Sequence, residues 1–135
     1  MWDYSAGGGN VVLIFGGAYQ GKLVYALDRF GLTDNDVYRC GDDINVPIGK
    51  AIIYEIDKWI LALIKADADT EEALRQFRDG NPEAVVICND ISCGIVPEDV
   101  VLRKWREVVG KSLAELSRHS DEVIRLFCGI PTRVK

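Results

Sequence analysis

Residues Val11–Lys22, with the sequence VVLIFGGAYQGK, decide the fold of this chain. The run from Val11 to Phe15 is unbroken, β-branched and apolar, which is typical of a strand buried on both faces of a parallel sheet. A glycine-rich turn follows at once and leads into a helical pattern that ends at Gly31. The order of strand, glycine-rich loop and helix predicts an α/β fold.

The glycine-rich turn matches the phosphate-loop pattern G-x-x-x-x-G-K, with Gly21 and Lys22 at its end. Backbone N–H groups of such a loop surround a phosphate, and Lys22 would reach its oxygens beside the helix N-terminus. Leu23 stands where the full pattern has Ser or Thr, so carboxylates or water would have to hold Mg²⁺. The alternative is a glycine-rich turn with a surface lysine. The residues expected to contact a nucleotide are Gly16, Gly17, Ala18, Tyr19, Gln20, Gly21, Lys22 and Leu23.

Strand and helix patterns alternate along the rest of the chain. The expected strands are 36–40, 51–56, 84–88 and 123–128, and the expected helices are 23–30, 57–66, 69–80 and a stretch from Pro97 through Leu116. Residues 51–65 are equally compatible with one long helix, and the chain after 131 is expected to be a short polar tail. The alternation predicts a three-layer α/β/α fold with a mostly parallel sheet, in one domain over residues 10–135 after a flexible lead-in over 1–9.

Composition narrows the class of partner. The 135 residues include 21 acidic and 16 basic side chains, giving a net charge of −5. An acidic chain is a poor partner for nucleic acid or an anionic membrane surface. The longest apolar runs are too short to span a membrane and no secretory pattern is visible, so we expect a cytoplasmic protein. The four cysteines lack a Cys-x-x-Cys spacing and do not predict a metal site.

Polar residues follow the expected strand 84–88. Asn89 and Asp90 would project toward the same sheet edge as Lys22, because ligands of such sheets lie beyond the carboxyl ends of the strands. Asp90 is therefore a candidate for binding Mg²⁺ or positioning water, and Arg103 and Arg106 on the next helix are candidates for neutralising phosphate charge. The alternatives are a polar strand end and surface pairing of the two arginines with neighbouring acids.

Four segments of the chain resemble one family. Gly16–Lys22 resembles the G-G-A-R-S-G-K-S loop of the bifunctional adenosylcobinamide kinase/adenosylcobinamide-phosphate guanylyltransferases. Asn89–Glu98 is similar to the family's S-N-E-V-G-x-G-I-V-P-x, and Arg103–Gly110 to its R-x-[FW]-R-[DE]-x-x-G. Asp121–Pro131 resembles its closing A-D-E-V…G-[LI]-P. The segments occur in the family's order and spacing.

The resemblance implies a P-loop, RecA-like fold, a homo-oligomer that is a trimer, and phosphorylation of adenosylcobinamide by ATP or GTP with Mg²⁺. It implies triphosphate binding by Lys22 and the loop, and it places Asp90 at the position of the family's glutamate; Lys22 and Asp90 are the expected catalytic residues. The family's aspartate near the third strand is Tyr54 here. Glu55 and Asp57 are therefore the further candidates for metal binding.

The family's guanylylated histidine lies in a basic stretch between its second and third strands. Residues 41–50 occupy that interval here and contain no histidine, while the single histidine, His119, lies elsewhere. The resemblance thus predicts a kinase-type transferase without the covalent guanylyl-transfer half. The alternative is a non-catalytic nucleotide- or corrinoid-binding relative that acts as a regulator or subunit.

Overall fold

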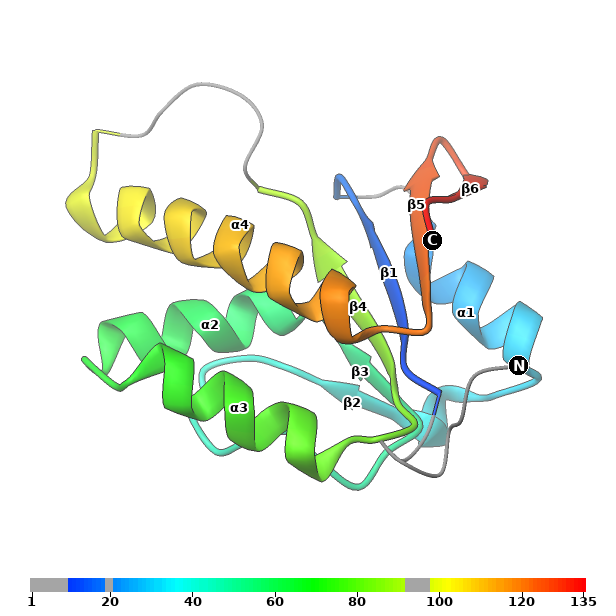
Figure 1. The fold of residues 1–135 in the computed structure, drawn as a ribbon, viewed down its shortest axis with the longest axis horizontal. Helices are drawn as coiled ribbons and strands as arrows, with labels where there is room; N and C mark the ends of the chain where they lie inside the picture. Colours follow the sequence, from blue (N-terminus) through cyan, green and yellow to red (C-terminus); the bar gives the residue numbers. More distant parts are fainter. Residues whose placement is uncertain (1–9, 19–20, 92–97) are drawn as a thin grey trace.

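The computed structural model describes residues 10–18, 21–91 and 98–135 of the chain (Figure 1). These residues form a sheet with the strand order β2-β3-β4-β1-β5-β6. The strands are β1 (Val12–Gly16), β2 (Val37–Arg39), β3 (Ile52–Tyr54), β4 (Val85–Asn89), β5 (Glu122–Phe127) and β6 (Ile130–Arg133). All neighbouring pairs are parallel except β5 and β6. The two central strands, β1 and β4, are almost fully buried, as their continuous apolar sequences predict.

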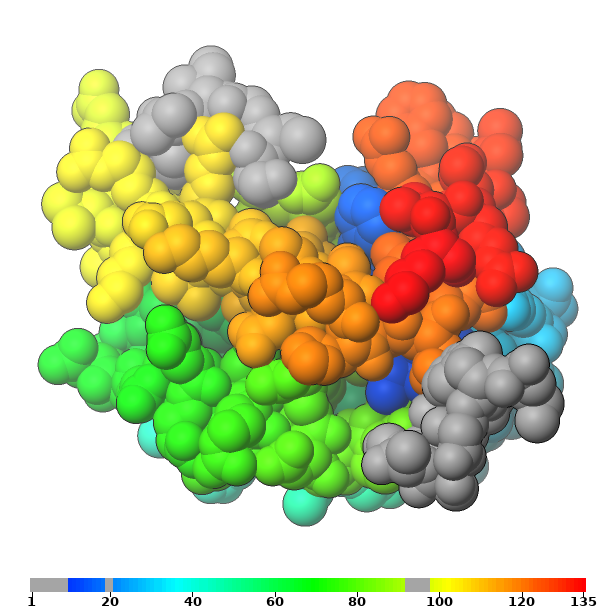
Figure 2. Space-filling view, in the orientation of Figure 1, coloured from blue at the N-terminus to red at the C-terminus, as the bar shows by residue number. Residues whose placement is uncertain are grey.

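Helices cover both faces of the sheet, so the predicted three-layer α/β/α arrangement is confirmed (Figure 1). Helix α1 (Lys22–Phe30) packs on one face. Helices α2 (Ile56–Lys65), α3 (Thr70–Gly80) and α4 (Val100–His119) cover the other. In the space-filling view of Figure 2, α3 and α4 occupy the middle of the visible surface, with the C-terminal strand beside them. Among the described residues no helix is both long and apolar enough to cross a membrane.

The ambiguity over residues 51–65 is resolved in favour of a strand followed by a helix. Glu55 has a φ of 60° and separates β3 from α2, so the single long helix is wrong. A left-handed residue interrupts helical hydrogen bonding, and it lets the chain turn sharply at the end of the strand. Glu55 consequently lies at the carboxyl edge of the sheet.

The C-terminal segment is not the polar tail that the sequence predicts. Ile130–Arg133 forms β6, which pairs antiparallel with β5 in the register Phe127 to Ile130. Cys128 and Gly129 form the two-residue turn and have φ values of 52° and 76°. Positive φ at both central residues is the geometry of the turn that favours tight hairpins. Residues 130–133 are exposed and show no buried apolar pattern, so the strand itself gives no sequence signal. The Cys128-Gly129 pair at the turn is the sequence feature that indicates the hairpin.

The connection between β2 and β3 is short and held by side chains from two helices. The Trp59 indole N–H donates a 3.1 Å hydrogen bond to the backbone oxygen of Ile44. The Asn81 side-chain amide donates a 2.8 Å bond to the backbone oxygen of Pro47. Both anchors bind backbone carbonyls of the connection. By the sequence resemblance, this segment is the one in which a guanylylated histidine would be expected.

Candidate functional site

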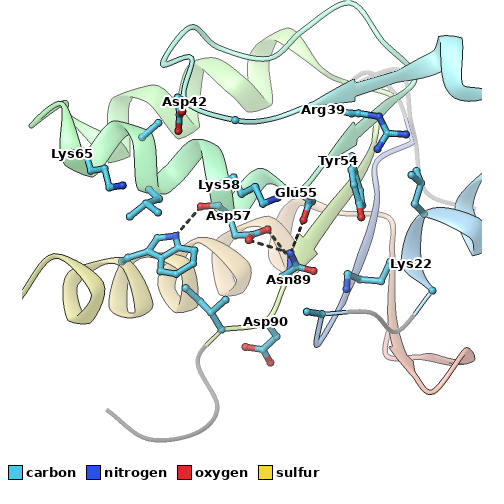
Figure 3. Close-up of a pocket in the computed structure, with 18 of the residues that line it drawn as sticks. Lys22, Arg39, Asp42, Tyr54, Glu55, Asp57, Lys58, Lys65, Asn89 and Asp90 are labelled. Carbon is cyan, nitrogen blue, oxygen red and sulfur yellow. Dashed lines mark hydrogen bonds and ion pairs between the residues drawn. The ribbon is translucent and has the colours of Figure 1, made fainter. Parts of the chain in front are cut away.

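A pocket of about 1120 Å³ lies at the carboxyl edge of the sheet, where the sequence predicts ligand binding (Figure 3). Its walls come from the loop after β1, from the ends of β2, β3 and β4, and from helices α1, α2 and α4. The sequence-predicted residues that line it are Ala18, Gly21, Lys22, Leu23, Glu55, Asp57, Asn89 and Asp90.

The glycine-rich loop needs its first glycine for close packing. A side chain at Gly16, whose φ is 156°, would collide with the backbone oxygen of Leu126 on β5. Gly21 adopts φ 84° and ψ 22° directly before α1. The sheet thus holds the start of the loop tightly, and the left-handed glycine turns the chain into the helix.

Lys22 is buried at the N-terminus of α1, with 4% of its surface exposed. Its ammonium donates a 2.6 Å hydrogen bond to the backbone oxygen of Gly17, within the loop. Burial lowers the pKa of Lys22 below its ordinary 10.5, and the nearby Asp57 carboxylate opposes that effect. A buried ammonium beside a glycine loop is electrostatically complementary to a phosphate group.

Asn89, at the end of β4, is the centre of a hydrogen-bond network. Its backbone N–H donates to Asp57 Oδ1 at 3.0 Å. Its side-chain amide donates to Asp57 Oδ2 at 3.3 Å and to Glu55 Oε2 at 3.2 Å (Figure 3). Lys58 pairs with the other Glu55 oxygen at 3.0 Å. The network fixes both carboxylates at the pocket wall.

Asp57 is buried beside this network, with 2% of its residue surface exposed. Burial raises its pKa above the ordinary 3.8, while the two hydrogen bonds from Asn89 act in the opposite direction. Trp105 on α4 donates its indole N–H to the backbone oxygen of Asp57 at 2.8 Å. The first turn of α2 is therefore held from β4 and from α4 together.

Asp90 follows Asn89 and is tied to the phosphate-loop strand. Its backbone N–H donates to the carbonyl oxygen of Gly16 at 2.8 Å, which joins the ends of β4 and β1. The residue lines the same pocket as Lys22. The structure thus brings together the two residues that the sequence nominates for catalysis.

The donor set of the pocket fits Mg²⁺, which takes oxygen ligands and keeps several waters. Glu55, Asp57 and Asp90 all line the pocket, and two of these carboxylates flank Asn89. Within residues 10–18, 21–91 and 98–135, no three histidine, cysteine or acidic side chains gather closely enough to enclose an ion. The arrangement suits a metal held by one or two carboxylates and by substrate phosphates.

Other nominated residues lie outside the pocket or outside the described chain. Arg103 is exposed and Arg106 half-buried on α4, and neither is among the residues that line the pocket. Gly16 and Gly17, at the start of the loop, are not among the residues that line the pocket, and the carbonyl of Gly17 accepts the hydrogen bond from Lys22. Tyr19 and Gln20 are outside the described residues. The role of the two arginines in phosphate binding remains a prediction.

Sequence reasoning missed several pocket residues. Arg39 and Tyr54 are the last residues of β2 and β3, and they line the pocket with Lys58, Lys65 and Trp105. The rule that ligands bind beyond strand ends would have found the first two. Trp105 packs against the core and also lines the pocket, and its helical spacing carries no sign of its hydrogen bond to Asp57.

His119 is the last residue of α4 and is exposed. The chain just after it, at Asp121, donates a backbone hydrogen bond to Val11 at the start of β1. That position is the amino edge of the sheet, opposite the pocket. His119 therefore lies away from Lys22, as its place in the sequence predicts.

Comparison with protein families gives one decisive match. Residues 42–134, more than half of the chain, match the family described as cobinamide kinase / cobinamide phosphate guanyltransferase. The chain belongs to this family. The resemblance noted from the sequence motifs is thereby confirmed, and it assigns the chain to nucleotide-dependent transfer in cobalamin biosynthesis at the level of the family. A comparison with curated protein sequences found no relative.

The matched range begins after the glycine-rich loop. It includes Glu55, Asp57, Asn89 and Asp90, but not Lys22. Membership of the cobinamide kinase / cobinamide phosphate guanyltransferase family therefore rests on the chain from the β2–β3 connection onward. The phosphate loop remains a prediction from its sequence pattern, and Lys22 lies buried at the N-terminus of the helix that follows it.

Proposed function

We propose that this protein binds a nucleoside triphosphate, ATP or GTP, and transfers its terminal phosphoryl group to the hydroxyl of adenosylcobinamide. The observation that carries the proposal is Lys22, buried in the pocket with its ammonium on the carbonyl of Gly17. A lysine so placed, at the junction of a glycine loop and a helix N-terminus, is an anion site. Family membership supports a corrinoid as the acceptor.

Phosphoryl transfer requires mainly positioning of the reacting groups and neutralisation of the phosphate charge. Lys22 exchanges the Gly17 carbonyl for the β- and γ-phosphate oxygens, and the loop N–H groups bind the rest of the phosphate chain. One or two of the carboxylates of Glu55, Asp57 and Asp90 would hold Mg²⁺, which would supply charge neutralisation at the phosphates. Asp90 also orients the acceptor hydroxyl from the end of β4.

The proposed activity is the kinase activity, one of the two activities that the family description names. The 41–50 connection lacks a histidine and His119 lies at the opposite edge of the sheet. We therefore propose that the protein does not form a guanylyl-histidine intermediate. We also propose a homo-oligomer, a trimer as the sequence resemblance implies.

The test incubates the purified chain with MgATP or MgGTP and adenosylcobinamide and measures the phosphorylated corrinoid. The wild-type protein is expected to form it, and Lys22→Ala is expected to abolish nucleotide binding and turnover. Lys65→Ala is the matched control, because Lys65 lines the same pocket from the last turn of α2. Absence of the phosphorylated product with both nucleotides would refute the proposed transfer.

A second function is favoured by two substitutions at the site. Leu23 lacks the hydroxyl that phosphate loops offer to Mg²⁺, and Tyr54 replaces an acidic position of the family motif. Both changes suit a relative that binds nucleotide or corrinoid without turnover and acts as a regulator or subunit. Calorimetric titration with ATP, GTP and adenosylcobinamide separates the two: binding without product supports this second function.

A further inference from the structure

The pocket has a second cationic group at the end of β2. Arg39 ends β2, and the register of the sheet sets it beside Tyr54, the last residue of β3. Its guanidinium carbon lies over the Tyr54 ring, 5.5 Å from the ring centroid. In Figure 3 Tyr54 and Arg39 lie on the side of the pocket that also holds Lys22, whereas Lys65 lies toward the other end.

Arg39 is a pocket cation that can accept a new anion in addition to Lys22. Lys58 already pairs with Glu55 at 3.0 Å, a contact that raises the pKa of Lys58. The partner of Arg39 is Asp34, at 3.2 Å, and the two side chains are 55% and 79% exposed. An ion pair so exposed to water contributes little to stability, so Arg39 can readily leave Asp34 and bind a ligand.

The form of the side chain also points to phosphate. A guanidinium offers a planar fork that matches two oxygens of a phosphate group, and stacking on an aromatic ring fixes that fork. Tyr54 is half-buried and packs with the α1 side of the core, so it gives Arg39 a rigid support.

The position of Arg39 in the sheet separates it from the phosphate loop. Neighbouring parallel strands lie about 4.8 Å apart, and β2 is three strands away from β1. Arg39 is therefore roughly 14 Å across the sheet from the phosphate-loop strand, so that Arg39 and Lys22 can contact different parts of a ligand.

We propose that Arg39, supported by Tyr54, binds the phosphate group of the phosphorylated acceptor. This inference rests on the proposed function: Lys22 holds the phosphates of the donor, and Arg39 holds the phosphate once it is attached to the corrinoid. Cobinamide phosphate, which the family description names, is the ligand with this chemistry. Arg39 is thus a specificity residue that distinguishes the phosphorylated corrinoid from the unphosphorylated one.

The test compares the affinities of cobinamide phosphate and cobinamide for the full chain by calorimetry, with and without a saturating nucleotide. Arg39→Ala is expected to weaken binding of cobinamide phosphate by about tenfold to hundredfold, since a hydrogen-bonded charge pair is lost. Binding of cobinamide and of nucleotide is expected to stay within about twofold. Because Arg39 is exposed, the variant is expected to fold, which thermal unfolding checks.

Five further variants sharpen the result. Arg39→Lys keeps the charge without the fork and is expected to recover only part of the affinity. Tyr54→Phe keeps the ring and the phosphate preference, whereas Tyr54→Leu removes the support and reduces the preference severalfold. Asp34→Ala removes the competing carboxylate, so cobinamide phosphate is expected to bind equally or more tightly. Lys65→Ala is the control for a general loss of positive charge and is expected to leave the preference unchanged.

The two proposals fail in different ways. A wild-type protein that binds neither corrinoid contradicts the proposed acceptor and removes this inference with it. A wild-type protein that phosphorylates cobinamide while Arg39→Ala retains the full preference for cobinamide phosphate overturns the inference alone. Equal weakening of both corrinoids by Arg39→Ala also overturns it, because that result assigns Arg39 to the corrinoid body.

Discussion

Asp57 and Trp59 stand two residues apart in the first turn of α2 and are equally buried, at 2% and 1% exposure. Trp59 enters the apolar layer beneath the helix, 5.6 Å from Phe77 by ring centroids. Asp57 instead faces the pocket wall and the buried ammonium of Lys22. Burial of the indole stabilises the fold, whereas burial of the carboxylate opposes its ionised form. Equal exposure thus hides opposite contributions to stability.

The largest expected effect lies on the apolar side of this comparison. Trp59→Ala removes a fully buried ring and the N–H that binds the Ile44 carbonyl, and it is expected to cost about 3–5 kcal/mol of unfolding free energy. Trp59→Phe retains much of the ring and is expected to cost less. Urea denaturation measures both. A loss below about 1 kcal/mol for the alanine variant would show that this layer does not anchor α2.

The next effect is expected where the phosphate loop touches the sheet. Gly16→Ala drives a methyl group into the Leu126 carbonyl and is expected to cost about 1–3 kcal/mol through backbone displacement. Gly41→Ala is the matched control, because a methyl group there meets no atom within 4 Å. The two unfolding midpoints give the comparison. Equal midpoints would mean that the loop tolerates displacement from β5.

Much of the fold follows from the sequence because its signals are local. The apolar runs at β1 and β4, the capping by Asp69 and the stop at Gly31 specify their elements directly. The end of β3 was ambiguous, since Glu55 carries no mark of its left-handed conformation. The hairpin at Cys128 was missed because β6 has no buried face.

The candidate site was partly predictable for the same reason. Lys22 and Asp90 follow strands whose sequence motifs are recognisable, and both line the pocket. Arg39 and Tyr54 end two short strands, and only their pairing across β2 and β3 brings them together. Such contacts depend on strand order, which a single sequence does not specify.

Replacing the buried charge of Lys22 is expected to change stability less than replacing the buried ring of Trp59. The lowered pKa of Lys22 means that the unfolded chain binds its proton more tightly than the folded protein does. This destabilisation is complete below the folded pKa and fades as the pH rises toward 10.5. Lys22→Met is therefore expected to gain stability relative to wild type at neutral pH, with the advantage shrinking at alkaline pH.

Thermal unfolding of wild type and Lys22→Met across that pH range provides the measurement. Lys65→Met is the control, because Lys65 is exposed and its charge stays solvated. An advantage of Lys22→Met that grows with pH would contradict the assigned cause of the pKa shift. The same variant is expected to lose nucleotide binding, so stability and ligand affinity would change in opposite directions.

The smallest effect is expected for charges outside the pocket. Lys111 pairs with Glu107 at 3.1 Å on the exposed face of α4. Lys111→Ala is expected to change the unfolding free energy by no more than about 0.5 kcal/mol, because water screens the pair. Urea denaturation at low and at high salt measures it. A loss above about 1 kcal/mol would place this pair among the structural contacts of α4.

Trp59 and Asn81 hold the β2–β3 connection by hydrogen bonds to the backbone carbonyls of Ile44 and Pro47. Carbonyl oxygens are present whatever the side chain, so these anchors place few demands on the identity of the residues that they hold. The exposed residues of this connection, apart from Gly49 with its φ of 93°, are therefore open to exchange or to insertion without disturbing the core. For protein engineering, this connection is a graft site that already opens beside a nucleotide-sized pocket, where new side chains can be offered to a bound ligand.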